Sequence, residues 1–282
     1  MGVARKVIEE PGQVAALAAL AERWEREDAG PERMIAWVGE RFGTDAVLAC
    51  SFGSEDCALV DMIARTSPRI GIFYLDTGLL FEETLATRDR LQERYGIRPI
   101  AFRPELTVAE QADVYGEALW AREPDRCCEM RKVRPLAAAL AGRLCWISGL
   151  RRDQAPTRAG TPLIQWDARF RLVKCNPLAR WTSEDVWEYI RLHDVPYNPM
   201  HDRGFPSIGC WPCTRAVAAG EDPRAGRWSG TGKTECGLHL PGAADGRGTA
   251  HAVAVGGDAV PGDGPHSATV AAPADGAEEL SR

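Results

Sequence analysis

Hydrophobic residues recur at helical spacing near the start of the chain. An amphipathic helix is predicted over 14–24, and a second is predicted to begin at Pro31, because proline suits the first turn of a helix. Met34 and Val38 follow one turn apart, so both lie on one face of that helix. We therefore expect residues 1–45 to form a helical segment that packs on the main domain.

Short apolar runs then alternate with helical patterns. Strands are predicted over 46–50, 70–75, 97–102, 144–148, 163–166 and 172–173, and helices around 59–64 and over 81–95, 108–115, 133–141 and 182–193. Thr182 is the expected N-cap of the last helix. Strands that alternate with helices indicate an α/β fold, with a mainly parallel sheet and helices on both faces.

The composition changes after this domain, which we place at residues 46–240. Residues 241–282 contain 11 Ala, 8 Gly and 4 Pro, and no Phe, Trp or Tyr. Such a segment cannot bury enough apolar surface to offset the entropy that folding costs. We expect it to be a disordered tail, and we expect its deletion to leave the activity of the domain unchanged.

Charge and hydropathy exclude two classes of partner. The net charge is −6, and six acidic residues and two arginines in 241–282 account for −4 of it. The rest of the chain is nearly neutral, so no broad nucleic-acid-binding face is expected. No apolar run is long enough to span a membrane, and the first residues lack the apolar stretch of a signal peptide. We expect a cytoplasmic protein, where thiols stay reduced.

Four of the nine cysteines form two close pairs, Cys127-Cys128 and Cys210-x-x-Cys213. If folding brings the pairs together, four thiolates suit a zinc ion or an iron–sulfur cluster. Structural zinc usually draws on two Cys-x-x-Cys knuckles, so the vicinal pair favours a cluster. A redox-active Cys-x-x-Cys and an unrelated buried pair remain alternatives. The cysteines that fall in or beside apolar runs are expected to be structural: Cys50, Cys57, Cys145 and Cys175.

A ninth cysteine, Cys236, lies between Lys233 and His239, in a segment that directly follows a glycine-rich run, 229–232. An exposed, mobile thiol among positive charges readily forms a nucleophilic thiolate. Cys236 is therefore the candidate nucleophile, and a surface thiol without function is the alternative.

Anion-binding features gather around predicted strand ends. The turn 51–56 joins a strand to a helix, which aims backbone N–H groups at an anion. It lacks the Gly-Lys-Ser/Thr ending of a Walker loop, and 230–234 is excluded as one because Arg227 replaces the required glycine. Basic residues near the motifs suit a phosphate or sulfate clamp: Arg131, Lys132, Arg151, Arg152, Arg158, Arg224 and Arg227.

Taken in order, these motifs resemble those of assimilatory adenylyl-sulfate (APS) reductases, the iron–sulfur class of the phosphoadenylyl-sulfate (PAPS) reductase family. The resemblance covers residues 46–240. It rests on Ser51-Phe52-Gly53-Ser54-Glu55-Asp56, Leu75-Asp76-Thr77-Gly78, Cys127-Cys128 with Arg131-Lys132, Gly149-Leu150-Arg151-Arg152-Asp153-Gln154, Cys210-Trp211-Pro212-Cys213-Thr214-Arg215 and Lys233-Thr234-Glu235-Cys236-Gly237-Leu238-His239.

The resemblance implies an adenine-nucleotide α-hydrolase-like fold and a role for each motif. One 4Fe-4S cluster per chain would be held by Cys127, Cys128, Cys210 and Cys213. Adenosine and phosphate would be bound by Ser51, Gly53, Ser54, Glu55, Asp56, Asp76 and Thr77. The phosphosulfate would be neutralised by Lys132, Arg224 and Arg227, with Arg151 or Arg158 as a further match. Cys236 matches the family nucleophile.

The implied reaction reduces APS to sulfite and AMP in sulfate assimilation and cysteine biosynthesis. Cys236 would carry an S-sulfocysteine, and thioredoxin or a similar dithiol would release sulfite. Three alternatives stay open: the same reaction on PAPS, a nucleotide-dependent sulfur transferase or ATP pyrophosphatase, and a cluster-bearing redox sensor. The sequence leaves the oligomeric state open, with a homo-oligomer among the possibilities.

Overall fold

The computed structural model describes residues 11–239. The expected tail over 241–282 and the first ten residues of the expected N-terminal segment lie outside that range. The helices and strands follow in the order α1 (Pro11–Arg26), α2 (Pro31–Phe42), β1 (Ala46–Ala49), α3 (Ser54–Thr66), β2 (Gly71–Leu75), α4 (Glu82–Tyr95), β3 (Ile100–Phe102), α5 (Val108–Tyr115), α6 (Leu119–Arg122), α7 (Pro124–Cys128), α8 (Arg134–Leu140), β4 (Cys145–Ile147), β5 (Ile164–Asp167), β6 (Leu172–Cys175) and α9 (Ser183–Leu192).

The strands form one six-stranded sheet in the order β3-β2-β1-β4-β6-β5. Every neighbouring pair is parallel except β5 and β6. Val47 in β1 pairs with Gly71 in β2 on one side and with Trp146 in β4 on the other. The predicted α/β class with a mainly parallel sheet is therefore confirmed.

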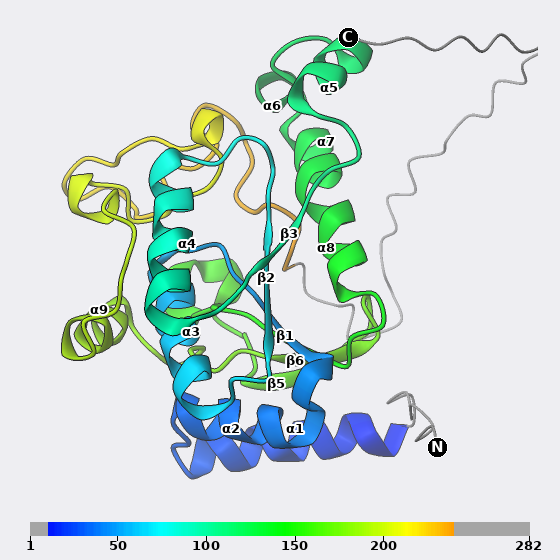
Figure 1. Ribbon diagram of the computed structural model, residues 1–282, viewed down its shortest axis with the longest axis vertical. Helices are drawn as coiled ribbons and strands as arrows, with labels where there is room; N and C mark the ends of the chain where they lie inside the picture. The colour runs from blue at the N-terminus through cyan, green and yellow to red at the C-terminus, as the bar shows by residue number, and fades with distance from the viewer. Residues whose placement is uncertain (1–10, 240–282) are drawn as a thin grey trace, which may run out of the picture. The chain divides into compact units, whose positions relative to one another are not determined.

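Helices cover both faces of this sheet (Figure 1). Because successive side chains of a strand point to opposite faces, Ala46 and Leu48 pack with α2 and α3 in the larger hydrophobic core. Val47, between them, packs in a second core with Leu136 and Leu140 of α8. The first core also holds Leu17 and Trp24 of α1, so both N-terminal helices share the core of the sheet.

The strand order reverses between β1 and β4. From β1 the chain builds outward through β2 and β3, and then returns to place β4 and β6 on the other side of β1. In open α/β sheets, ligands bind at the carboxyl ends of the strands where this reversal occurs. The loops after β1 and β4 are therefore expected to form the ligand site.

Most predicted elements are present, but one strand is shorter and three short helical elements were not predicted. The predicted strand over 97–102 is shorter, since Pro99 has no N–H to pair with β2 and the strand begins only at Ile100. Helices α6 and α7 and a π-helical turn, Glu129–Val133, were not predicted, because such short elements carry too few residues to show a period.

The predicted N-cap of the last helix is confirmed. Thr182 accepts a hydrogen bond from the N–H of Asp185, whose carboxylate accepts one in return from the N–H of Thr182. Within residues 11–239, every helix is too short or too polar to cross a membrane.

Candidate active site

A cavity of about 870 Å³ opens where the strand order reverses. Its walls include the loop after β1 and the loop after β4, as the topology predicts. The predicted site residues that line it are Ser51, Gly53, Ser54, Glu55, Asp56, Thr77, Lys132, Arg151, Arg158, Cys210, Arg224, Arg227 and Cys236. Asp76 is not among the lining residues; its carboxylate pairs with Arg103 at 3.0 Å.

The loop after β1 is held in an unusual backbone conformation. Phe52, a buried residue, has φ of 61°, in the left-handed region that bulky side chains rarely adopt. The N–H and the hydroxyl of Ser51 each donate to one carboxylate oxygen of Asp56 at 2.6 Å, which closes the turn. Strain of this kind persists where surrounding contacts fix it, commonly at ligand sites.

Asp56 also faces the loop after β4. A side-chain carbon built on Gly149 would lie 2.5 Å from an oxygen of Asp56, so only glycine lets the two loops approach so closely. Burial raises the pKa of Asp56 to about 6, although the hydrogen bonds from Ser51 act in the opposite direction.

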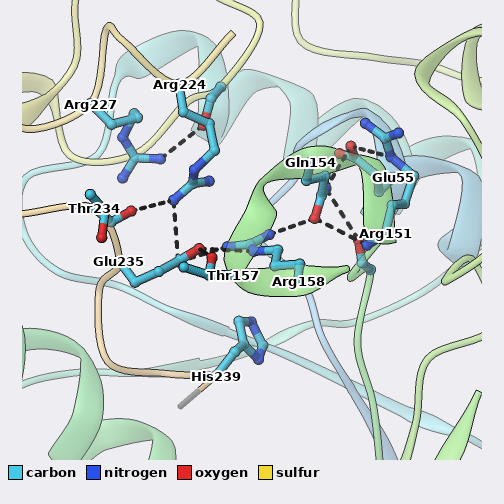
Figure 2. Close-up of polar contacts among 12 residues, drawn as sticks. Glu55, Arg151, Gln154, Thr157, Arg158, Arg224, Arg227, Thr234, Glu235 and His239 are labelled. Atoms are coloured by element: carbon cyan, nitrogen blue, oxygen red, sulfur yellow. Dashed lines mark hydrogen bonds and ion pairs between the residues drawn. The ribbon is translucent and has the colours of Figure 1, made fainter. Parts of the chain in front are cut away.

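A polar network of side chains extends from Glu55, after β1, to Glu235 (Figure 2). Arg151 is buried, and its Nε donates to Glu55 at 3.0 Å while a second nitrogen pairs with Asp153. Gln154 donates to the same Glu55 oxygen at 2.9 Å and accepts from Arg158. The charge of Arg151 is thus already compensated by two carboxylates.

Arg158 and Arg224 converge on Glu235, the residue before Cys236 (Figure 2). Arg158 contacts the carboxylate with two nitrogens, at 2.8 and 3.0 Å, and Arg224 contacts it at 3.2 Å. Thr157 donates a further hydrogen bond at 3.3 Å. Burial alone would raise the pKa of Glu235, but the hydrogen bonds and charges of the two arginines outweigh it and lower that pKa.

Arg227 and Lys132 also line the cavity, and neither has a carboxylate within ion-pair distance in the described part of the chain. Arg227 donates to Ser207 at 3.2 Å and to the carbonyl of Ile208 at 3.3 Å, while its Nε is buried without a partner. A side-chain carbon on Gly209 would lie 2.1 Å from this guanidinium. Uncompensated cations in a cavity wall suit an anionic ligand.

The segment after Cys236 is docked on the second core. Arg169 donates to the carbonyl of Gly237 at 2.7 Å, and Leu238 packs against the core that contains Trp146. His239 stacks on the indole of Trp146, and its Nδ1 lies 3.2 Å from Nζ of Lys174. Burial, and secondly the charge of Lys174, hold the pKa of His239 well below its ordinary value. Cys236 is therefore fixed on both sides while it lines the cavity.

The four paired cysteines surround a second, small cavity. Folding therefore brings Cys127 and Cys128 together with Cys210 and Cys213, as the sequence required of a metal or cluster site. Burial, and then the charges of the other three thiols, raise the pKa of Cys127 to about 11. Within residues 11–239, no three Cys, His, Asp or Glu side chains converge closely enough to hold a single metal ion.

Thr77 joins the two cysteine segments at the end of β2. Its hydroxyl lies 3.3 Å from Sγ of Cys210, and its carbonyl accepts a hydrogen bond of 2.6 Å from buried Arg131. Arg131 and Lys132 belong to the π-helical turn that directly follows Cys128. Although they are neighbours in sequence, only Lys132 reaches the large cavity, whereas Arg131 is buried and hydrogen-bonded to backbone carbonyls and to Gln111.

Several residues in or next to the cavity wall were missed from the sequence alone. Glu235 and His239 lie in a predicted motif but were assigned no contact, and the sequence signal was their position beside Cys236. Trp228 lines both cavities and lies under the cations of Arg227 and Lys233 at 4.6 and 5.7 Å from its ring centre. Trp146 could have been found from the alternation of side chains along β4. This alternation places it on the opposite face of the sheet from Cys145 and Ile147, in the second core.

The chain is similar to known proteins along most of this domain. Residues 45–216 match the family model of the phosphoadenosine phosphosulfate reductase domain. Adenosine 5'-phosphosulfate reductase from Oceanobacillus iheyensis is 49% identical over 214 residues, which are 76% of this chain and 89% of the relative. Phosphoadenosine 5'-phosphosulfate reductase from Gloeobacter violaceus is 51% identical over 223 residues, 78% of this chain and 92% of that relative.

A solved structure supports the same assignment. Phosphoadenylyl-sulfate (PAPS) reductase from Candida auris, in a phosphate complex, is similar with a TM-score of 0.61 at 26% identity, covering 74% of this chain and 98% of that chain. The family model covers more than half of the chain, and the relatives match over three quarters of it. The chain belongs to the phosphoadenosine phosphosulfate reductase domain family.

Proposed function

We propose that the protein reduces APS to sulfite and AMP, with Cys236 as nucleophile and a thioredoxin-like dithiol as the electron donor. The observation that carries this proposal is the position of Cys236 in the wall of a cavity that also presents Lys132, Arg224 and Arg227. A thiol and several cations around one ligand-sized cavity are what transfer of an anionic sulfonate group requires.

In the first step the Cys236 thiolate attacks the sulfur of the sulfate group. An S–S bond forms, the bond from that sulfur to the bridging oxygen breaks, and AMP leaves with the bonding electrons. An anion approaching another anion is opposed electrostatically, so cations must offset the charge in the transition state. Lys132 and Arg227, which lack carboxylate partners among the described residues, are the groups best suited to do so.

In the second step a thiolate of the dithiol attacks Sγ of the S-sulfocysteine, and sulfite leaves. The second thiol of the donor then displaces Cys236 from the mixed disulfide. The donor loses two electrons and ends as a disulfide, and the sulfate sulfur gains them as sulfite. A reduced dithiol is available in the cytoplasm, where we propose that the protein acts.

The four paired cysteines fit a 4Fe-4S cluster, because all four line one cavity and thiolates are the ligands that such clusters use. Bound there, a cluster would hold the two cysteine segments together and add its charge beside Lys132, with no electron passing through it in the proposed reaction. The chain contributes Thr77, which contacts Cys210, and Arg131, which follows the helix that ends with Cys127 and Cys128 and binds the carbonyl of Thr77.

APS is the proposed substrate because several relatives that are 47 to 49% identical are named adenosine 5'-phosphosulfate reductases. The Gloeobacter violaceus relative, at 51%, is named for PAPS, so PAPS is the second candidate. The two substrates differ by one 3'-phosphate. Turnover of the cluster-loaded protein on each substrate, at matched concentration, decides between them.

Mass spectrometry of the reduced, cluster-loaded protein mixed with APS, without reductant, tests the mechanism. We expect a sulfonate-sized adduct on the peptide that contains Cys236, which thioredoxin then removes. Cys236→Ser should give no adduct and no sulfite while it retains the visible absorbance of the cluster. Sulfite production by Cys236→Ser, or an adduct on another cysteine, would contradict the proposal.

A further inference from the structure

Glu235 directs its carboxylate at two arginines of the cavity wall. Arg158 grips it with two nitrogens, at 2.8 and 3.0 Å, and Arg224 adds a third contact at 3.2 Å (Figure 2). Two parallel N–H donors on one carboxylate are the geometry by which guanidinium also binds phosphate and sulfate. In this state the chain supplies the anion for two of the cavity's arginines itself.

This ion cluster is largely shielded from water. The side chains of Arg158, Arg224 and Glu235 are 12%, 17% and 21% exposed, so the pairing is screened less than a surface salt bridge would be. Both arginines nevertheless line the cavity, beside Arg227 and Lys132. An anion that enters the cavity and reaches Arg158 or Arg224 must therefore compete with Glu235.

Competition between Glu235 and a ligand anion affects the position of the nucleophile, because Glu235 directly precedes Cys236 in the chain. On the amino-terminal side, residues 229–232 are exposed, and side-chain carbons on Gly230 and Gly232 would meet only open space. The contacts of Glu235 thus fix the Cys236 segment on this side, together with the contact from Arg224 to the carbonyl of Thr234 at 3.0 Å. Release of Glu235 removes the side-chain anchor next to Cys236 and leaves the ion pair of Lys233 with Asp125 on the amino-terminal side, and the contacts of Gly237 and His239 on the other side.

We propose that Glu235 is a positioning residue, an internal anion that keeps Cys236 docked in the empty cavity and yields Arg158 and Arg224 to the phosphate or sulfate group of the ligand. The exchange loosens the Cys236 segment only when an anion is present. This inference rests on the proposed function in one respect, that the ligand is an adenylyl sulfate or its product AMP.

AMP binding to the cluster-loaded full chain tests the exchange. If Glu235 holds the arginines for about four-fifths to nine-tenths of the time, Glu235→Gln should bind AMP about fivefold to tenfold more tightly than the unchanged protein. A residue with a merely structural role would weaken binding when it is replaced. Glu221→Gln is the matched control, since Glu221 pairs with Arg215 outside the cavity and should leave AMP affinity unchanged.

Alkylation of Cys236, followed on its own peptide, gives a second measurement that needs no variant. Inorganic sulfate or AMP should accelerate alkylation in the unchanged protein, and Glu235→Gln should react fast with or without the anion. Equal or weaker AMP binding by Glu235→Gln, or alkylation that anions leave unchanged or slow, overturns the inference. Failure of the unchanged protein to bind AMP would instead count against the proposed function, while the response to sulfate still decides the role of Glu235.

Discussion

The imidazole of His239 lies nearly parallel to the indole of Trp146, with ring centres 5.1 Å apart and planes 18° apart. Lys174 contacts both rings, with its Nζ 4.3 Å from the centre of the indole and 3.2 Å from Nδ1 of His239. The end of the Cys236 segment is therefore fixed on strands β4 and β6 rather than on another loop.

We expect His239→Ala to reduce sulfite production about threefold to tenfold, because a stacked aromatic pair contributes about 0.5–1.5 kcal/mol. The loss should fall on kcat, since the substituted side chain positions Cys236 and AMP affinity should change little. His193→Ala is the matched control, as His193 packs on Tyr189 outside the cavity. Full activity in His239→Ala would show that the stacking does not position the nucleophile.

The docking of His239 should depend on pH. The docked imidazole has a pKa well below its ordinary 6.5, owing to burial and to the charges of Lys174, Arg158, Arg224 and Arg169. The neutral ring is thus the docked form, so docking is complete above about pH 6.5 and weakens as pH falls below it.

The alkylation rate of Cys236 is measured at each pH in the unchanged protein and in His239→Gln. The ratio of the two rates cancels the titration of the thiol itself. We expect this ratio to rise as the solution is acidified from about pH 8 to about 5.5. A ratio that stays flat over the range would contradict the role of the imidazole.

Lys174 should destabilise the fold. It is 3% exposed, has no carboxylate within ion-pair distance among the described residues, and burial lowers its pKa from 10.5 to about 8. The folded state holds the proton less tightly than the unfolded state does. The free-energy cost of burying the charged lysine is therefore complete below pH 8 and is relieved as pH rises toward 10.5. Lys174→Met should therefore raise the free energy of unfolding at pH 7 by up to about 3 kcal/mol.

Urea denaturation at a series of pH values measures this effect. The gain from Lys174→Met should shrink between about pH 8 and 10, where the buried lysine loses its charge. A variant that is less stable than the unchanged protein at every pH would indicate that the contacts of Lys174 with Trp146 and His239 outweigh the cost of its burial.

Gly209→Ala should weaken substrate binding although it removes no charged group. The added carbon would lie 2.1 Å from a nitrogen of Arg227, so the guanidinium must shift. We expect KM to rise about tenfold, as a misplaced charged donor loses most of its hydrogen-bond energy. Gly160→Ala, where the added carbon meets only open space, should leave KM unchanged. An equal effect of both substitutions would exclude this explanation.

Replacement of Cys127 or Cys213 by serine should abolish the visible absorbance of an iron–sulfur cluster, because each supplies one of four thiols around the small cavity. Cys175→Ala is the control, since Cys175 lies buried in β6, away from that cavity. Retained absorbance in Cys127→Ser would remove that residue from the proposed ligands.

The fold could be predicted largely from local patterns. Strands β1, β2 and β4 are short apolar runs that end in polar turns, and each was predicted within one or two residues of its bounds. The carboxyl ends of parallel strands share one edge, so the joint position of Ser51, Thr77 and Arg151 around one cavity followed from the predicted topology.

What the sequence could not provide was the pairing of charges. Arg151 and Arg158 look equivalent in the chain, yet one is buried between Glu55 and Asp153 and the other holds Glu235. Such partners come from segments up to 96 residues apart, so no local spacing reveals them. Arg131 and Lys132 likewise make different contacts because both lie in a π-helical turn. No hydrophobic period in the sequence predicts such a turn.

Three side chains line both the large cavity that contains Cys236 and the small cavity among the four paired cysteines: Lys132, Cys210 and Trp228. If a ligand in one cavity displaces one of these side chains, the free energy of binding in the other cavity also changes. Thermodynamic linkage makes that coupling reciprocal. If loss of the cluster lowers the affinity for nucleotide by a given factor, bound nucleotide must make the cluster harder to remove by the same factor.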